Sequence, residues 1–255
     1  MPQTARASAN WWRVPSSPPL VEERAGALGG QVGSEAGPLA VFRDVGVRLG
    51  ATPVLRAVDL EVAPGQAVGL VGANGSGKTT LLRVLATLLP PTSGCGTVLG
   101  APLDSPARFA VRPAITLLGH VPALYPQLTL EENLQMMVRL LGERPGQAAR
   151  ALEVVGLAGA RHRRAGHCSQ GMLRRAELAR ALIARPRLLL LDEAHAGLDP
   201  AASELVELLV AEVRGRGGAA VLVSHEPRRL RPLVDRTVEL ADGRLRPVQE
   251  AADAE

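Results

Sequence analysis

A glycine-rich run that follows a short apolar segment constrains this chain more than any other feature. Residues 67–71, Ala-Val-Gly-Leu-Val, predict a buried strand, and residues 72–79 read Gly-Ala-Asn-Gly-Ser-Gly-Lys-Thr. The run matches G-x-x-x-x-G-K-[ST], the P-loop, in which a glycine-rich turn joins a strand to a helix. The match predicts a strand–loop–helix unit that binds the phosphates of a nucleotide.

Each part of this loop suits phosphate binding. The glycines let successive backbone N–H groups converge on phosphate oxygens without a Cβ in the way, and the helix expected over 79–89 adds the positive end of its dipole. Lys78, the only lysine of the sequence, is expected to reach the β- and γ-phosphates, and the Thr79 hydroxyl is expected to bind Mg²⁺. The predicted nucleotide-binding residues are Gly72, Ala73, Asn74, Gly75, Ser76, Gly77, Lys78, Thr79 and Thr80.

Apolar strands and helices alternate along most of the chain. Two continuous apolar runs, 188–191 and 219–223, predict strands that are buried on both faces. The other expected strands are 39–47, 54–62 and 238–240, the expected helices include 205–213, and residues 105–178 look mostly helical and more polar. Alternation of this kind predicts an α/β fold with a mainly parallel sheet.

Composition excludes several other classes. The 255 residues are 46% hydrophobic, which is enough for one core with a smaller lobe, but no apolar run approaches the roughly 20 residues of a membrane span. The net charge of +4 comes from scattered arginines, and with 2% aromatic residues no basic run interleaves with aromatics, so no nucleic-acid partner is expected. The two cysteines, Cys95 and Cys168, have no spacing typical of a disulfide framework or a zinc site.

The strand at 188–191 ends in two carboxylates, Asp192 and Glu193. In phosphoryl transfer, one carboxylate can hold Mg²⁺ through its water shell and another can orient or deprotonate the attacking water. The alternative is an acidic turn after a buried strand. The P-loop upstream favours the chemical interpretation.

A second helix start is marked by Cys168-Ser169-Gln170-Gly171-Met172. Ser169 is placed as an N-cap, and the helix is expected to run to about residue 185, with apolar residues on one side and arginines opposite. By physics alone this is an ordinary capped amphipathic helix. A helix N-terminus is also a phosphate site, so both interpretations stay open here.

Together these motifs resemble ATP-binding cassette (ABC) ATPases. GANGSGKTT, CSQGM with its helix, LLLLDE, GLD at 197–199 and Ser-His at 224–225 occur in the order of that family, over about residues 39–245. The resemblance implies a P-loop NTPase with a RecA-like, mainly parallel core, an antiparallel β subdomain and a helical subdomain at about 105–178. It places the domain at 39–248, before a C-terminal tail at 249–255. Residues 1–38 are rich in Pro, Ser, Gly and Ala, which predicts a disordered tail, and the alternative is a docking peptide built on Trp11 and Trp12.

By the same resemblance, Ser169, Gln170 and Gly171 look like the signature loop, which meets the γ-phosphate of ATP held by a second ATPase chain. Asp199 resembles the aspartate of the neighbouring D-loop. The implied assembly is a homodimer with ATP and Mg²⁺ between its two chains.

The resemblance also implies catalytic roles. Glu193 is similar to the catalytic glutamate, Asp192 to the aspartate that supports Mg²⁺, and His225 to the switch histidine that contacts the γ-phosphate. His120 stands where the family has a glutamine whose oxygen contacts Mg²⁺ or its water. A neutral imidazole can take that role through its ring nitrogen, and the alternative is a hinge residue without metal contact.

Several positions depart from the family pattern. Three of the five residues of the usual signature LSGGQ are replaced, Ala194 stands where proline normally follows the glutamate, and Leu49 stands where an aromatic ring often stacks on adenine. The Ser-x-Gly-Met signature and residues 119–124 look most like the ATPase subunits of haem exporters for cytochrome c maturation.

The implied function is ATP hydrolysis that powers export by separate membrane permease subunits, from a peripheral position on the cytoplasmic face of the cell membrane. Haem is the specific cargo hypothesis. The alternatives are the ATPase of a multidrug- or lipid-type exporter and a non-transport ABC ATPase.

Overall fold

The computed structural model describes residues 37–193, 200–224 and 227–248. The predicted tails at 1–38 and 249–255 lie outside these residues, apart from positions 37 and 38, as do Asp199 and His225.

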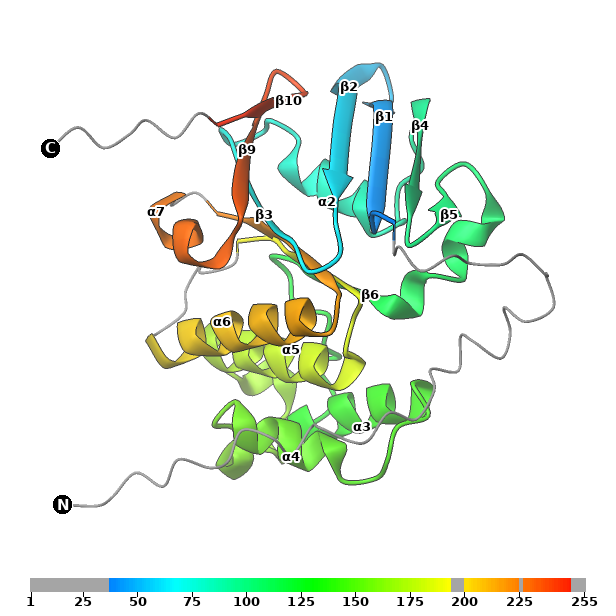
Figure 1. Cartoon of the computed structure of the whole chain (residues 1–255). Helices are drawn as coiled ribbons and strands as arrows, with labels where there is room; N and C mark the ends of the chain where they lie inside the picture. Colours follow the sequence, from blue (N-terminus) through cyan, green and yellow to red (C-terminus); the bar gives the residue numbers. More distant parts are fainter. Residues whose placement is uncertain (1–36, 194–199, 225–226, 249–255) are drawn as a thin grey trace, which may run out of the picture. The chain divides into compact units, whose positions relative to one another are not determined.

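The central element is a six-stranded sheet with the order β10-β9-β3-β8-β7-β6 (Figure 1). Five neighbouring strands are parallel, and β10 pairs antiparallel with β9 at one edge. The strands are β3 (Ala67–Val71), β6 (Ile115–Leu118), β7 (Leu188–Leu191), β8 (Ala219–Val223), β9 (Arg236–Ala241) and β10 (Arg244–Pro247). The predicted mainly parallel sheet is confirmed.

A second sheet is antiparallel and has the order β2-β1-β4-β5. Its strands are β1 (Ala40–Leu49), β2 (Thr52–Val62), β4 (Ser93–Val98) and β5 (Ala101–Pro102). This sheet is the antiparallel β subdomain implied by the sequence.

Helices occupy both sides of the central sheet. They are α2 (Lys78–Leu85), α3 (Leu130–Leu140), α4 (Gln147–Val154), α5 (Gln170–Ala184), α6 (Pro200–Gly215) and α7 (Pro227–Leu230). Short 3₁₀ helices lie at Pro106–Phe109, Arg112–Ala114, Ala158–Ala160, Ala165–His167 and Arg231–Leu233. Within the described residues, no helix combines the length and apolar character that crossing a bilayer requires.

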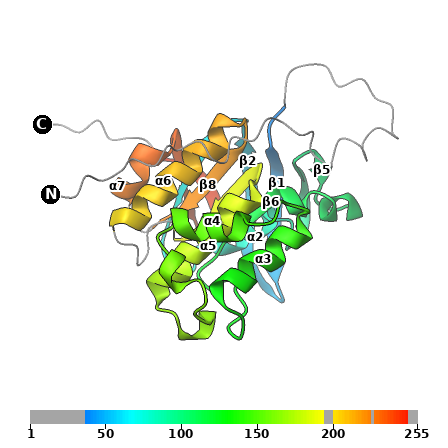
Figure 2. The same cartoon turned by 90° about the horizontal axis from the view of Figure 1, so that it is seen from below.

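Alternating side chains of the central strands build two cores. In β7, Leu188 and Leu190 pack with α2 and the antiparallel sheet, whereas Leu189 and Leu191 pack with α3 to α6. All four leucines are fully buried. Figure 2 shows α3 to α6 in front of the strands on this second face. The continuous apolar run of β7 is therefore explained by cover on both faces.

The expected helical stretch at 105–178 also contains a strand. β6 pairs parallel with β7, with Leu118 opposite Leu191. The strand has four residues, follows a 3₁₀ turn and carries a buried polar side chain, Thr116, which weakens its apolar signal. The expectation of a mostly helical segment was wrong at this point.

The ends of several other elements also differ from expectation. α2 ends at Leu85 rather than near 89, because Thr87 adopts a left-handed conformation and the N–H groups of Leu88 and Leu89 donate to the Arg83 carbonyl. α6 extends beyond the expected 205–213 at both ends. The last expected strand, 238–240, is longer and is followed by β10.

Candidate nucleotide-binding and hydrolysis site

The P-loop joins the end of β3 to the start of α2, as its sequence predicts. Gly72 and Gly77 have φ values of 146° and 107°, which favour glycine, and a Cβ at Gly72 would overlap the Leu240 carbonyl oxygen. Among the described residues, no side chain caps the N-terminus of α2. The first N–H groups of the helix are therefore left for an anion, which the positive end of the dipole attracts.

The Lys78 side chain is hydrogen-bonded to this loop. Lys78 is 7% exposed, and its Nζ donates hydrogen bonds to the carbonyl oxygens of Gly72 (2.8 Å) and Ala73 (2.9 Å). The Ser76 hydroxyl is buried and has no hydrogen-bond partner among the described residues. A buried hydroxyl needs a hydrogen-bond partner, and a phosphate oxygen can accept its hydrogen bond. The loop therefore fits a nucleotide phosphate chain.

Thr79 and Asp192 are brought together from distant parts of the chain. The Thr79 hydroxyl donates to Asp192 Oδ2 at 2.9 Å, and Asp192 is 7% exposed at the end of β7. A hydroxyl and a carboxylate are hard oxygen ligands of the kind that Mg²⁺ prefers. Thr79 and Asp192 would hold the ion directly or through its waters, and their contact fits the predicted metal role.

Glu193 has an unusual backbone. It follows Asp192 at the carboxyl end of β7, its side chain is half-buried, and its φ of 58° lies in the left-handed region. A non-glycine residue there costs about 1 kcal/mol and persists only where its surroundings hold it. Such strain occurs at functional sites, but Ala57 and Leu99 share this conformation outside the site, so the catalytic role of Glu193 remains a prediction.

His120 lies at the same edge of the sheet. It follows β6 by two positions and is exposed, and the Asp192 N–H donates to the Leu118 carbonyl at 2.9 Å. The ends of β6 and β7 are thus hydrogen-bonded neighbours. This placement agrees with either role weighed for His120, metal contact or hinge.

The predicted N-cap of α5 is confirmed. Ser169 Oγ accepts a hydrogen bond from the Met172 N–H at 3.3 Å, and Ser169 and Gln170 are exposed at the start of the helix. Gly171 follows in the first turn. Burial raises the pKa of the neighbouring Cys168 thiol. The hydrogen bond of Ser169 stays within its own helix, so the role of this loop toward ATP remains a prediction.

Two predicted residues, Asp199 and His225, lie outside the described residues. The structure does place the residue before His225: Ser224 is 4% exposed, directly after β8. β8 lies between β3 and β7, so its carboxyl end is at the same edge as the P-loop and Asp192.

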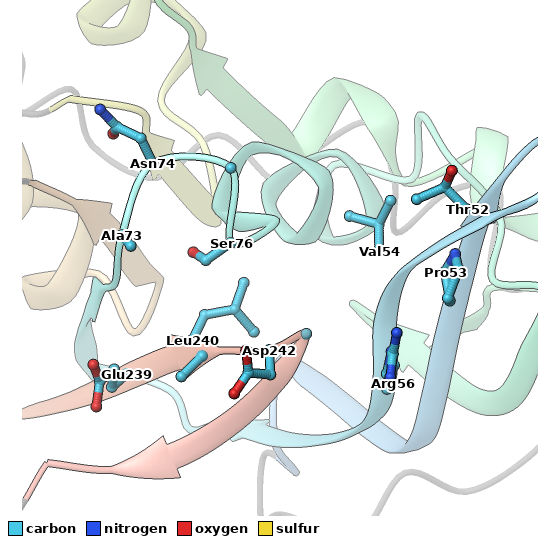
Figure 3. Close-up of a pocket in the computed structure, with 13 residues that line it drawn as sticks. Thr52, Pro53, Val54, Arg56, Ala73, Asn74, Ser76, Glu239, Leu240 and Asp242 are labelled. Atoms are coloured by element: carbon cyan, nitrogen blue, oxygen red, sulfur yellow. The ribbon is translucent and has the colours of Figure 1, made fainter.

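A cavity of about 630 Å³ adjoins the P-loop (Figure 3). The P-loop forms one side of it, the start of β2 faces the loop, and the β9–β10 turn forms a third side. Val54 and Leu240 give it apolar walls, and Arg56, Glu239 and Asp242 give it polar ones. The cavity has room for a nucleoside and polar groups for its hydroxyls and base edges.

Sequence reasoning did not single out Arg174 and Arg180, which it placed only among the arginines opposite the apolar side of the helix that Ser169 caps. Arg180 Nη2 donates to the Leu117 carbonyl at 3.1 Å and pairs with buried Glu177. Arg174 donates to the backbone beside the carboxylates. A helical-wheel pattern cannot separate a solvated arginine from one that reaches a neighbouring strand end.

Comparison with known proteins gives a consistent result. Residues 55–196 match the family model for the ABC transporter. The chain is 37% identical to Nod factor export ATP-binding protein I of Rhizobium etli, over 80% of this chain and 65% of that protein, so the match spans less than two thirds of that relative's length. It is 38% identical to cytochrome c biogenesis ATP-binding export protein CcmA 2 of Cupriavidus metallidurans, over 72% of this chain and 88% of that protein.

A solved ATP-binding subunit of an ABC transporter superposes with a TM-score of 0.75 at 28% identity, covering 82% of this chain and 90% of that chain. The chain therefore belongs to the ABC transporter family, as an ATP-binding subunit.

Proposed function

We propose that this chain hydrolyses Mg²⁺-bound ATP to power a membrane exporter. The observation that carries the proposal is the Thr79–Asp192 contact of 2.9 Å beside the P-loop. The contact supports a metal site next to the expected phosphate site, and Glu193 follows Asp192 directly in the chain. A nucleotide-binding module without turnover would not need this third group.

The chain's own residues divide the chemical work. Mg²⁺ would neutralise charge on the transferring phosphate and fix its geometry. Lys78 exchanges its bonds to the Gly72 and Ala73 carbonyls for phosphate oxygens, and the uncapped N–H groups of α2 bind the same anion. The Glu193 carboxylate orients the attacking water and accepts its proton. His225 would contact the γ-phosphate.

The partners follow from the family. An ATP-binding subunit of an ABC transporter works with integral membrane permease subunits and, in this proposal, with a second copy of this chain. Its position is then peripheral, on the cytoplasmic face of the cell membrane. Export is favoured because the names of both curated relatives describe export proteins. A non-transport ABC ATPase is the alternative.

Haem is the cargo we infer for this exporter. The signature Ser169-Gln170-Gly171-Met172 and residues 119–124 support it by their resemblance to haem exporters, and one relative is named for cytochrome c biogenesis. The other relative is named for Nod factor export, which keeps the alternative of a multidrug- or lipid-type exporter open. Co-expression with candidate permeases and pull-down of this chain, with haem and lipid cargo assayed in vesicles, separates the two: cargo movement with a lipid permease alone contradicts the haem assignment.

The enzymatic part is tested by substitution of Lys78. Wild-type protein should release phosphate from ATP with Mg²⁺ and lose this activity in EDTA, because the phosphate charge is then not neutralised. Lys78→Met removes the ammonium that bridges the loop, so ATP affinity should fall at least about tenfold, equivalent to about 1.4 kcal/mol. Nucleotide titration measures this loss. Unchanged affinity in a folded Lys78→Met protein would contradict the assigned phosphate site.

His120 gives a second test, this time of coupling. If its imidazole replaces the family glutamine, His120→Gln should keep most of the ATPase activity and of the transport driven by it. His120→Ala removes the acceptor and should hydrolyse ATP without equivalent transport. The measurement is the ratio of phosphate released to cargo moved in the reconstituted complex. Equal ratios in the alanine and glutamine variants would remove His120 from the site.

A further inference from the structure

One arginine of α5 bonds the backbone on both sides of the proposed hydrolysis site. Arg174 Nη1 donates to the Gly119 carbonyl at 3.0 Å, and Nη2 donates to the carbonyls of Asp192 (3.3 Å) and Glu193 (3.1 Å). A single guanidinium therefore ties the segment after β6, the segment after β7 and the first turns of α5. Planar guanidinium donors are suited to such a fixed set of acceptors.

The surroundings make this contact costly to form and costly to lose. Burial lowers the pKa of Arg174, while the carboxylates of Glu177, Asp192 and Glu193 act in the opposite direction. The guanidinium thus gives up part of its hydration and keeps carbonyl and carboxylate neighbours in return. A buried charge of this kind depends on its hydrogen bonds. Nη1 and Nη2 are bonded to the three carbonyls, whereas the buried Nε has no partner among the described residues.

Of the three acceptors, the Glu193 carbonyl oxygen bears most directly on hydrolysis. The Glu193 backbone is left-handed, with φ 58°, and because this residue has a Cβ the conformation is less favourable than it would be for glycine. The bond from Arg174 to the Glu193 carbonyl fixes the orientation of that peptide, and with it the direction in which the Glu193 side chain leaves the backbone. An error of about 1 Å in the position of a catalytic group can cost about a hundredfold in rate.

We propose that Arg174 is a positioning residue for hydrolysis, which holds the Asp192–Glu193 backbone in the conformation that directs the Glu193 carboxylate at the attacking water. The proposal rests on the proposed function of Glu193. Because Arg174 belongs to the helix that Ser169 caps, it also makes the orientation of the carboxylate depend on the position of α5. A shift of α5 away from β7 would release the peptide and slow hydrolysis while leaving the P-loop intact.

The kinetic test compares Arg174→Gln with Arg174→Lys. Glutamine removes the positive charge and most of the N–H donors of the guanidinium. The Glu193 backbone is then held less firmly, so kcat should fall roughly ten- to a hundredfold. The affinity for ATP should stay within about twofold, because the phosphate contacts are untouched. Lysine offers one ammonium, which reaches fewer of the three carbonyls, and should give an intermediate kcat. Arg139→Gln, an exposed arginine of α3, is the matched control and should behave as wild type.

A double variant separates positioning through Glu193 from a general structural role. If Arg174 acts through Glu193, adding Arg174→Gln to Glu193→Gln should slow hydrolysis little further, because the two residues act as a unit. Independent effects would multiply and would overturn the proposal. So would a wild-type kcat in folded Arg174→Gln. If that variant melts below the assay temperature, Arg174→Lys is measured in its place, and a wild-type kcat there overturns the proposal in the same way.

Amide exchange tests the same contact without turnover. The Asp192 N–H, which donates to the Leu118 carbonyl, should exchange at least about tenfold faster in Arg174→Gln, while amides of β8 keep their rates. Unchanged exchange at Asp192 contradicts the holding role. If wild type and Glu193→Gln hydrolyse ATP equally, the proposed function of Glu193 fails, and the exchange result still decides whether Arg174 holds this backbone.

Discussion

Glu193→Gln is expected to bind ATP like the wild type and to lose about 10²- to 10⁴-fold of the hydrolysis rate. The amide has nearly the shape of the carboxylate but cannot accept a proton from water. Glu193 is the residue whose side chain leaves the sheet edge directly after Asp192, which contacts Thr79. Steady-state phosphate release gives the rate, and titration with labelled ATP gives the affinity.

The control for this variant is Glu153→Gln, which removes a carboxylate from an exposed position of α4 and should leave both quantities unchanged. Thermal unfolding of all three proteins checks that the fold is kept. Hydrolysis at the wild-type rate in Glu193→Gln would show that another group handles the water. Loss of ATP affinity equal to the loss of rate would place Glu193 in binding instead.

The parts of the fold that sequence could predict are those whose side chains are covered on both faces. β3, β7 and β8 lie at the residues of the apolar runs, because every position in such a strand must be apolar. β6 was missed, since four residues with Thr116 among them carry too little of this signal. The edge strand β10 has exposed arginines and gave no signal for the same reason.

In the candidate site, too, sequence could predict the local motifs but not the contacts between distant segments. The P-loop and the two carboxylates are local patterns, and the P-loop dictates its own backbone through glycines such as Gly72 and Gly77. Contacts between distant segments have no such pattern. Arg174 was placed only among the arginines opposite the apolar side of its helix, because helical periodicity alone cannot reveal that the Gly119 and Glu193 carbonyls lie within its reach.

ATP is expected to convert Glu193→Gln from a monomer into a dimer. In the proposed assembly, the P-loop of one chain and the start of α5 of the other bind opposite sides of the same ATP. Ser169 and Gln170 are exposed at that helix start, and the N-terminus of a 15-residue helix favours an anion. Since both chains contribute the same two surfaces, the interface is self-complementary and closes as a pair. Slow hydrolysis keeps the γ-phosphate in place and so prolongs the dimer.

Size-exclusion chromatography with light scattering should therefore give twice the monomer mass with ATP and Mg²⁺, and the monomer mass without nucleotide or with ADP. Ser169→Arg in the Glu193→Gln background is the decisive control. An arginine at this exposed position adds bulk in front of the helix start without removing any group of the chain's own P-loop. It should keep ATP affinity and abolish the dimer. A dimer that survives Ser169→Arg would place the interface elsewhere, and a monomer in ATP and Mg²⁺ would contradict a nucleotide sandwich formed by this chain alone.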